Sequence, residues 1–385
     1  MPIDGHVNVA TLSDQERLAL GQQLQQRAHW HDKAMCFRIS VRKALRDRET
    51  EAKKAIIAEL QQMLTMKVWH GVLLGDLSTD QRRRILRCVV FLKDKFTARG
   101  VFEKFKARLC VDGSRQDHAL YEDVSSPTAT TTSVLAMAAV AAWEGRKVMT
   151  VDVGGAFLHA DIKLAGGELV HVELDEIMTR FLLELDPSYE HVKTRRGTII
   201  VELDRALYGT IQAARCWYDL LKKELMGWGF KPNPFDPCVF NKTTPTGKQC
   251  SIVLHVDDMM VSCVDERALD DLSRQLRLRF GEDRVTEHRG QVLDFLAMTF
   301  DFTKSGEARV TMKRLVDDIL EGCGVEKTYA TPAIDQLFEI RQATKLGTSE
   351  RDYFRTYVAK LLYVAKRVVV IRVLHVCVCA ISLSI

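Results

Sequence analysis

Two adjacent acids, Asp257 and Asp258, lie between two runs of β-forming residues. The runs cover residues 251–256 and 259–264 and consist mainly of Ile, Val, Leu and Met. Two such runs separated by two residues predict a β-hairpin that carries the acidic pair at its tip. The chain must therefore contain a sheet in which both strands are paired and the carboxylates sit at one end.

A third acid, Asp152, lies near the end of another strand-like run at residues 148–153. Turn chemistry alone explains an Asp after a strand, because turns favour this residue. Carboxylates on two neighbouring strand ends also suit nucleotidyl transfer, which uses two divalent ions about 3.5–4 Å apart. Hard cations of this kind bind carboxylate oxygens. Both interpretations stay open at this point.

The remaining pattern predicts an α+β fold. Apolar residues at helical spacing predict helices at residues 55–69, 133–143, 211–228 and around 269–276, the last ending at Gly281. A further strand is expected at residues 198–203. The order strand, helix, strand, hairpin, helix predicts an antiparallel sheet with helices on one face.

The chain has 385 residues, of which 46% are hydrophobic, enough for one large core or two to three subdomain cores. Its net charge of +4 indicates no particular partner, but residues 81–108 contain ten basic residues and two acidic ones. Such a run can bind phosphates. It is also typical of a solvated surface.

The ten cysteines are scattered singly and lack the spacing of a zinc knuckle, so we expect reduced thiols. The first thirty residues contain no apolar run of the kind that a secretory signal needs. Both features predict an intracellular, reducing compartment.

Several motifs resemble the reverse transcriptase of copia-type LTR retrotransposon Pol polyproteins. The central ones are MTVDVGGAFLHADI, ALYGTIQAARCWYDLL, DPCVF and IVLHVDDMMV. Upstream, KFKARLCVDG and SSPTATTTSVLAMAAVAA are similar to the strand and alanine-rich helix of that family, and RLVDDILEGCGVEKTYATP and YVAKLLYVAKR to its later helices. The resemblance covers roughly residues 55–367, with the motifs in the family's order.

The resemblance implies a right-hand polymerase with fingers, palm and a partial thumb or connection. The expected boundaries are a polar helical N-terminal extension at 1–54, fingers at 55–130, palm at 131–282, thumb-like helices at 283–367 and an apolar tail at 368–385. It also implies an RNA template with a primer and deoxynucleoside triphosphates as partners. Asp152, Asp257 and Asp258 would be catalytic, and Asp152, Asp257 and the Val153 carbonyl would hold two Mg²⁺ ions, with Mn²⁺ as an alternative.

Six further residues are implied to bind the nucleotide: Lys106, Arg108, Phe157, Tyr208, Gly209 and Gln212. Phe157 would exclude a 2′-hydroxyl, while Lys106 and Arg108 would bind the triphosphate. Without the resemblance, Phe157 is a core residue and the two cations are surface charges. Gly209 would permit a close backbone approach, and Gln212 is equally explained as an ordinary first-turn helix residue.

The sequence departs from the family at several positions. His255 stands where the family usually has Tyr, Gly154 and Gly155 where it often has Lys and Thr, and Ala214 where it usually has Pro. After Arg367 the family pattern gives way to VVVIRVLHVCVCAISLSI, for which we expect a frame shift or truncation in the gene. A membrane anchor is the weaker interpretation, because Arg372 interrupts a segment of barely 20 residues.

The leading hypothesis is a segment that acts as an RNA-directed DNA polymerase, with the integrase and ribonuclease H of the polyprotein absent from this chain. It would work in the cytoplasm, in a virus-like particle where the element is active, or in the nucleus. The altered tail favours an alternative, an inactive remnant that still binds nucleic acid. A scaffold without a nucleic-acid role is the third possibility, and salt-dependent binding to a primer–template duplex separates it from the second.

Overall fold

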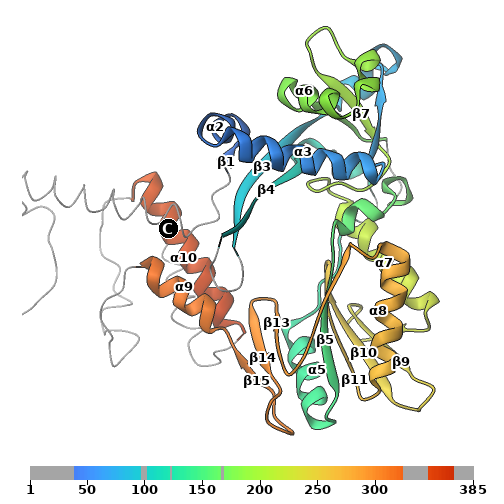
Figure 1. Cartoon of the computed structure of the whole chain (residues 1–385), viewed down its shortest axis with the longest axis vertical. Coiled ribbons are helices and arrows are strands. Elements are labelled where there is room, and N and C mark those ends of the chain that lie inside the picture. The colour runs from blue at the N-terminus through green and yellow to red at the C-terminus, as the bar shows by residue number, and fades with distance from the viewer. Residues whose placement is uncertain (1–38, 97–101, 122–123, 166–168, 324–345, 368–385) are drawn as a thin grey trace, which may run out of the picture. The chain divides into compact units, whose positions relative to one another are not determined.

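The computed structural model describes residues 39–96, 102–121, 124–165, 169–323 and 346–367 (Figure 1). The chain divides into two compact units, one formed by Ile39–Met312 and the other by the segments that flank it in the sequence. Most of the expected N-terminal extension and the whole tail at 368–385 lie outside the described residues.

A six-stranded sheet forms the first half of the larger unit. The path order is β1-β3-β6-β7-β2, and β4 pairs with the other edge of β3. The strands are β1 (Ile39–Ser40), β2 (Trp69–Val72), β3 (Leu86–Phe96), β4 (Phe102–Val111), β6 (His171–Leu174) and β7 (Ile199–Leu203). All pairs are antiparallel except β3 with β6.

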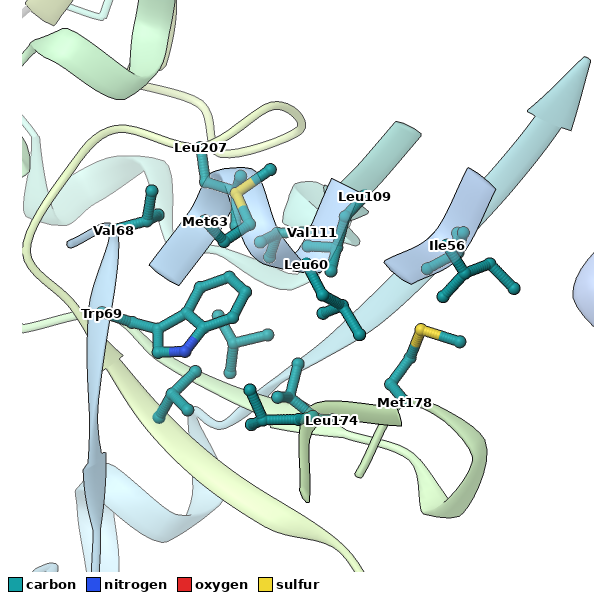
Figure 2. Close-up of a cluster of buried hydrophobic side chains, with 14 of the residues drawn as sticks. Ile56, Leu60, Met63, Val68, Trp69, Leu109, Val111, Leu174, Met178 and Leu207 are labelled. Carbon is teal, nitrogen blue, oxygen red and sulfur yellow. The ribbon is translucent and has the colours of Figure 1, made fainter. Parts of the chain in front are cut away.

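The core of this first sheet forms against α3 (Glu49–Thr65) and α6 (Glu176–Leu185). Figure 2 shows Leu60 of α3 and Leu109 of β4 among the apolar side chains that fill the core. The sequence predicted a helix at 55–69, but α3 begins and ends earlier. Lys67 has a φ of 51°, which breaks the helix and lets Trp69 start a strand.

A second six-stranded sheet, entirely antiparallel, has the order β12-β5-β11-β10-β9-β8. Its strands are β5 (Lys147–Val153), β8 (Lys231–Pro232), β9 (Val239–Thr243), β10 (Gln249–His255), β11 (Asp258–Cys263) and β12 (Val285–Arg289). The predicted hairpin is β10–β11, and the predicted strand at 148–153 is β5. Both are confirmed, except that the two-residue turn holds Val256 and Asp257, so Asp258 begins β11 instead of lying at the tip.

Helices cover both faces of this second sheet, which corrects the prediction of helices on one face. Arg146, which follows α5 (Thr131–Trp143), donates to the hydroxyl of Ser262, on the same face of β11 as Asp258. On the opposite face, Ser273 of α8 (Glu266–Phe280) donates to Glu287 of β12. The central strands β10 and β11 are buried along almost their whole length, so each face needs a covering helix (Figure 1).

The predicted helix at 211–228 is α7 (Ala213–Gly227), which packs beside α8 through the rings of Trp217 and Phe280. A third sheet contains β13 (Val292–Phe295), β14 (Met298–Asp301) and β15 (Arg309–Thr311). The remaining helices of the larger unit are α2 (Val41–Asp47), α4 (Thr79–Arg83), η2 (Leu74–Asp76), η3 (Gly113–Arg115), η4 (His118–Leu120), η5 (Ala156–His159), η6 (Ile162–Ala165) and η7 (Pro187–Val192).

The smaller unit is described through α9 (Lys313–Cys323) and α10 (Thr348–Ala365), which pack together. The Tyr353 hydroxyl donates to the Gly322 carbonyl at 3.2 Å. A Cβ atom on Gly322 would lie 2.1 Å from the Tyr357 hydroxyl, so the Tyr357 ring takes this position because residue 322 lacks a side chain. Among the helices that the structure describes, none has the length and apolar character needed to span a membrane.

Candidate active site

Strand pairing brings the predicted acids together at one end of the second sheet. Asp152 of β5 lies directly opposite Asp258 of β11. Residues paired in this way have Cβ atoms about 4.5–5.5 Å apart and point to the same face. Asp257 occupies the two-residue turn between His255 and Asp258, which pair across the hairpin. Two acids separated by more than a hundred residues in the sequence thus become neighbours.

The turn that carries Asp257 is strained. Val256 has a φ of 61°, a conformation that a β-branched residue rarely adopts and that costs about 1–3 kcal/mol. The indole N–H of Trp217 donates to the Val256 carbonyl at 2.7 Å, and the Trp217 side chain is fully buried. The apolar spacing of the sequence predicted only the helix at 211–228 that contains Trp217. It could not show that the indole holds the acidic turn.

The three carboxylates concentrate negative charge. Burial, followed by the charges of Asp257 and Asp152, raises the pKa of Asp258 to about 6. A bound cation would favour the charged form of this group and offset the repulsion. The site therefore offers closely spaced oxygen donors with a charge that fits hard divalent cations.

A cavity of about 340 Å³ opens beside the acids. It is lined by Asp152 and Asp258 from the second sheet and by residues 295–297, the turn between β13 and β14. Leu296 and Ala297 in this turn have φ angles of 52° and 58°. Sequence reasoning missed this hairpin, because its two turn positions lack the Gly or Asn that usually marks such a turn.

Three predicted nucleotide-binding residues form a row near the acids. The rings of Phe157 and Tyr208 have centroids 4.7 Å apart, and the Arg108 guanidinium lies 4.3 Å from the centre of the Tyr208 ring. Burial raises the pKa of Tyr208 to about 12; the charge of Arg108 opposes this shift, whereas those of Asp257 and Asp152 add to it. Tyr208 therefore lies within electrostatic reach of both acids.

Gly209 allows a close approach between two backbone segments. It has a φ of 93°, and a Cβ atom there would lie 2.0 Å from the Val111 carbonyl oxygen of β4. A Cβ atom on Gly113 would in turn lie 2.1 Å from the Gly209 carbonyl oxygen. The Val111 amide donates to the Tyr208 carbonyl at 2.7 Å across the same approach. Gly113, which the sequence analysis did not single out, is thus part of the same contact.

Gln212 is buried and only 1% exposed. Its side-chain oxygen accepts a hydrogen bond from the Gln116 amide at 3.1 Å, and the Gln116 oxygen accepts from the Ile211 amide at 3.0 Å. Gln212 therefore joins the start of α7 to the loop that follows β4. The sequence held no signal for Gln116.

Lys106 lies two residues before Arg108 in β4 and is half-buried. The charges of both residues act on the carboxylate of Glu59 in α3. Burial raises the pKa of Glu59 against the hydrogen bond that this carboxylate accepts from the Leu109 amide at 2.9 Å. The described interactions thus link Lys106 to α3.

The glycines that follow Val153 have a packing reason. Gly155 has a φ of 68°, and a Cβ atom there would lie 2.7 Å from the side-chain nitrogen of Gln62 in α3. The Gly154 amide donates to the Arg284 carbonyl at 2.7 Å, next to β12. This departure from the family pattern therefore accompanies close packing of α3 on the turn after Asp152.

The sequence that carries this acidic site is similar to those of known proteins. A family model described as reverse transcriptase (RNA-dependent DNA polymerase) matches residues 67–335. The Pol polyprotein of transposon TNT 1-94 from Nicotiana tabacum is 25% identical over 61% of this chain and 17% of its own length. That of transposon RE1 from Arabidopsis thaliana is 26% identical over 73% of this chain and 18% of its own.

A more distant similarity extends to yeast. The Gag-Pol polyprotein of transposon Ty1-NL2 from Saccharomyces cerevisiae is 21% identical over 68% of this chain and 14% of its own length. The chain thus spans less than a fifth of the length of these curated relatives.

Proposed function

Because the chain belongs to the reverse transcriptase (RNA-dependent DNA polymerase) family of copia-type transposon Pol polyproteins, we propose that it extends a DNA primer on an RNA template. The reaction site would be the cluster of Asp152, Asp257 and Asp258. The observation that carries the proposal is the cross-strand pairing of Asp152 with Asp258, with Asp257 in the adjoining turn.

Asp152, Asp257 and the backbone carbonyl of Val153 would hold two Mg²⁺ ions, or Mn²⁺ in their place. When bound, such ions activate the primer hydroxyl and stabilise the departing pyrophosphate. Asp258 would complete the cluster, and its raised pKa supports this role because a bound cation relieves the repulsion among the acids. The Trp217 indole would keep Asp257 in position through the Val256 carbonyl.

The incoming deoxynucleotide would lie against the row formed by Phe157, Tyr208 and Arg108. Phe157 would contact the sugar, where an aromatic ring leaves no room for a 2′-hydroxyl. Arg108 would bind the triphosphate through its fork of donors, and Lys106 would add a point charge from the same strand. The 4.7 Å spacing of the Phe157 and Tyr208 rings supports a single binding surface.

Gly209 and Gln212 would form the border of the nucleotide and template site. Both connect the segment before α7 to β4 and the loop after it, the first by close backbone contact and the second through Gln116. In this proposal they order the surface that Tyr208 presents. His255, on the same sheet face as Asp258, would replace the usual Tyr near the primer end.

The chain would have the arrangement of a right hand, with fingers at 55–130, palm at 131–282 and thumb-like helices at 283–367. The two sheets support separate fingers and palm layers. In the observed topology β6 and β7 complete the first sheet and β12 joins the second, so each layer also receives strands from a neighbouring segment.

Two surfaces would contact the primer and template. The turn at residues 295–297 lines the cavity with Asp152 and Asp258, which suits a contact to the primer end. The exposed basic side chains that extend from α4 into β3 and β4 suit the template backbone: Arg82, Arg83, Arg84, Arg87, Lys93 and Lys104.

An inactive remnant that still binds nucleic acid is the second candidate. The substitution of His for Tyr at position 255, in the acidic hairpin itself, favours it. Both candidates bind a primer–template duplex, but only the polymerase extends the primer. Measuring duplex binding and primer extension together therefore separates them.

The test measures Mg²⁺-dependent extension of a DNA primer on an RNA template by the purified chain. Asp257→Asn removes a charge without changing the shape of the side chain, and Asp271→Asn on the exposed surface of α8 is the matched control. We expect extension by the wild type and by Asp271→Asn, and none by Asp257→Asn. A folded wild type that binds the duplex in a salt-dependent manner but does not extend it would support the remnant.

A further inference from the structure

The outer edge of β4 binds a carboxylate of α3. Among the described strands, β4 pairs only with β3, so the backbone N–H groups on its other edge need different partners. The Val111 amide donates to the Tyr208 carbonyl at 2.7 Å, and the Leu109 amide donates to the Glu59 carboxylate at 2.9 Å. Glu59 thus satisfies this edge of the strand next to Tyr208.

Two cations of the candidate nucleotide surface lie close to this hydrogen bond. Arg108 directly precedes Leu109 in β4, and Lys106 is two residues earlier, on the same face of the strand as Arg108. The charges of both cations act on the Glu59 carboxylate. The Glu59 charge acts in turn on Tyr208, whose ring centre lies 4.3 Å from the Arg108 guanidinium. Glu59 is therefore within electrostatic reach of three residues of that surface.

The hydrogen bond from Leu109 does not require a charged acceptor. The side-chain oxygen of a glutamine would accept from the same N–H group. Burial raises the pKa of the Glu59 carboxyl, whereas the hydrogen bond from Leu109 and the charges of Lys106 and Arg108 lower it. A charge in this position thus has a desolvation cost that a neutral amide would avoid. What the charge adds is attraction for the two cations.

A nucleoside triphosphate would meet this carboxylate as a competitor. Its phosphate oxygens are negatively charged and would bind the same two cations, Lys106 and Arg108. Like charges repel, and a partly buried carboxylate is screened by salt less than an exposed one. The Glu59 charge therefore attracts the two cations while the site is empty and opposes the triphosphate when it binds.

We propose that Glu59 is a positioning residue of the nucleotide surface with two separable effects. Its hydrogen bond to the Leu109 amide holds the edge of β4 that carries Lys106 and Arg108. Its negative charge competes with the triphosphate for these two cations and so limits how tightly the nucleotide binds. The inference rests on the proposed function, because it takes Lys106 and Arg108 as the triphosphate ligands.

Two substitutions separate the hydrogen bond from the charge. Glu59→Gln keeps an acceptor for the Leu109 amide and removes the charge, whereas Glu59→Leu removes both. Leu109 is buried, so the midpoint of urea unfolding should fall in Glu59→Leu and stay near that of the wild type in Glu59→Gln. Glu49→Gln is the matched control, because Glu49 is an exposed residue of the same helix, about 15 Å away along its axis.

The test measures the dissociation constant of a deoxynucleoside triphosphate for the full chain on a primer–template duplex whose primer lacks its 3′-hydroxyl. Such a primer allows the nucleotide to bind and prevents extension, so the measurement does not depend on catalysis. We expect Glu59→Gln to bind the nucleotide roughly threefold to tenfold more tightly than the wild type, and Glu49→Gln to bind like the wild type. In an Arg108→Gln background, Glu59→Gln should have a smaller effect, because one of the contested cations is gone.

Equal dissociation constants for the wild type and Glu59→Gln would overturn the inference, as would an effect of the same size with and without Arg108. A wild type that binds no triphosphate would overturn it as well. An unchanged urea midpoint in Glu59→Leu would contradict the positioning by the hydrogen bond. Tighter binding by Glu59→Gln in a chain that does not extend an ordinary primer would support the inference and count against the polymerase alone.

Discussion

Single side chains decide whether the acidic turn keeps its shape. Val256 is held in a left-handed conformation that a valine does not adopt by preference, and its carbonyl accepts the indole N–H of Trp217. Trp217 also contacts the ring of Phe280 at a centroid distance of 5.3 Å. The helix α7 thus supports a turn of the second sheet through one buried donor.

Replacing Trp217 by Phe should keep the aromatic packing and remove this donor. The Val256 carbonyl would lose its buried partner, at a cost of about 1–3 kcal/mol. We expect primer extension to fall roughly tenfold, equivalent to about 1.4 kcal/mol in the barrier, and half-maximal activity to need more Mg²⁺. The measurement is the extension rate across a Mg²⁺ titration.

Tyr218→Phe is the matched control for that experiment. It removes the hydroxyl that donates to the Pro237 carbonyl at 3.0 Å, on the same helix but away from the turn. A loss of activity in Trp217→Phe without a change in the Mg²⁺ requirement would indicate general destabilisation and contradict the positioning role.

The partly buried His159 should make the free energy of unfolding depend on pH. It lies against the rings of Trp217 and Phe280, and burial lowers its pKa to about 4, although a hydrogen bond to the Gly154 backbone opposes the shift. Because its pKa is lowered, His159 binds a proton less readily in the folded state than in the unfolded state, and acid therefore favours unfolding. The stabilisation is present above the unfolded value of about 6.5 and is lost as the pH falls toward 4.

Between pH 7.5 and 4.5 the wild type should therefore lose about 1–2 kcal/mol more unfolding free energy than His159→Gln, after allowance for solvent screening. Urea titrations at several pH values measure the difference. His118→Gln, which changes an exposed histidine, should follow the wild type. Parallel pH curves for the wild type and His159→Gln would show that this histidine does not control acid stability.

At the level of elements, the junction between β4 and the segment before α7 depends on two glycines. A Cβ atom added to Gly209 would lie 2.0 Å from the Val111 carbonyl oxygen, and one added to Gly113 would lie 2.1 Å from the Gly209 carbonyl oxygen. This contact sets where β4, with Arg108, meets Tyr208. The ring and guanidinium of the candidate nucleotide surface thus depend on a backbone contact that no side chain could accommodate.

Gly209→Ala should destabilise the protein by more than about 4 kcal/mol, because both the backbone angle and the Val111 oxygen oppose a side chain. Gly247→Ala is the control with a similar φ of 76° but nothing within 4 Å of the added atom. Its cost should be only about 1 kcal/mol. Chemical denaturation measures both, and equal costs would mean that the close approach is unimportant.

For the whole molecule, the division into two compact units predicts separate folding. Residues 39–312 contain the three sheets that the structure describes and the acidic site, while α9 and α10 belong to the other unit. A fragment that covers 39–312 should unfold in one cooperative urea transition with a native-like circular dichroism spectrum. A gradual transition of this fragment, alongside a cooperative one for the full chain, would contradict the prediction.

Local sequence patterns predicted much of the second sheet. The hairpin around Asp257 and Asp258, the strand before Asp152 and the helices α5, α7 and α8 all follow from β-forming runs, apolar spacing and glycine positions. The prediction was less accurate where tertiary contacts compete with local preference. Lys67 ended α3 early, and helices covered both faces of the sheet because the central strands are apolar on both sides.

The sequence by itself thus determined the family, the acidic hairpin and the helices α3, α5, α7 and α8, because each is encoded within a short stretch of chain. Only the tertiary structure decided that Asp152 lies opposite Asp258, that Arg108 meets Tyr208, and that Glu59 accepts from the edge of β4. These neighbours come from elements distant in the sequence. Their register depends on how whole sheets pack, and a shift of one residue would turn each side chain to the other face.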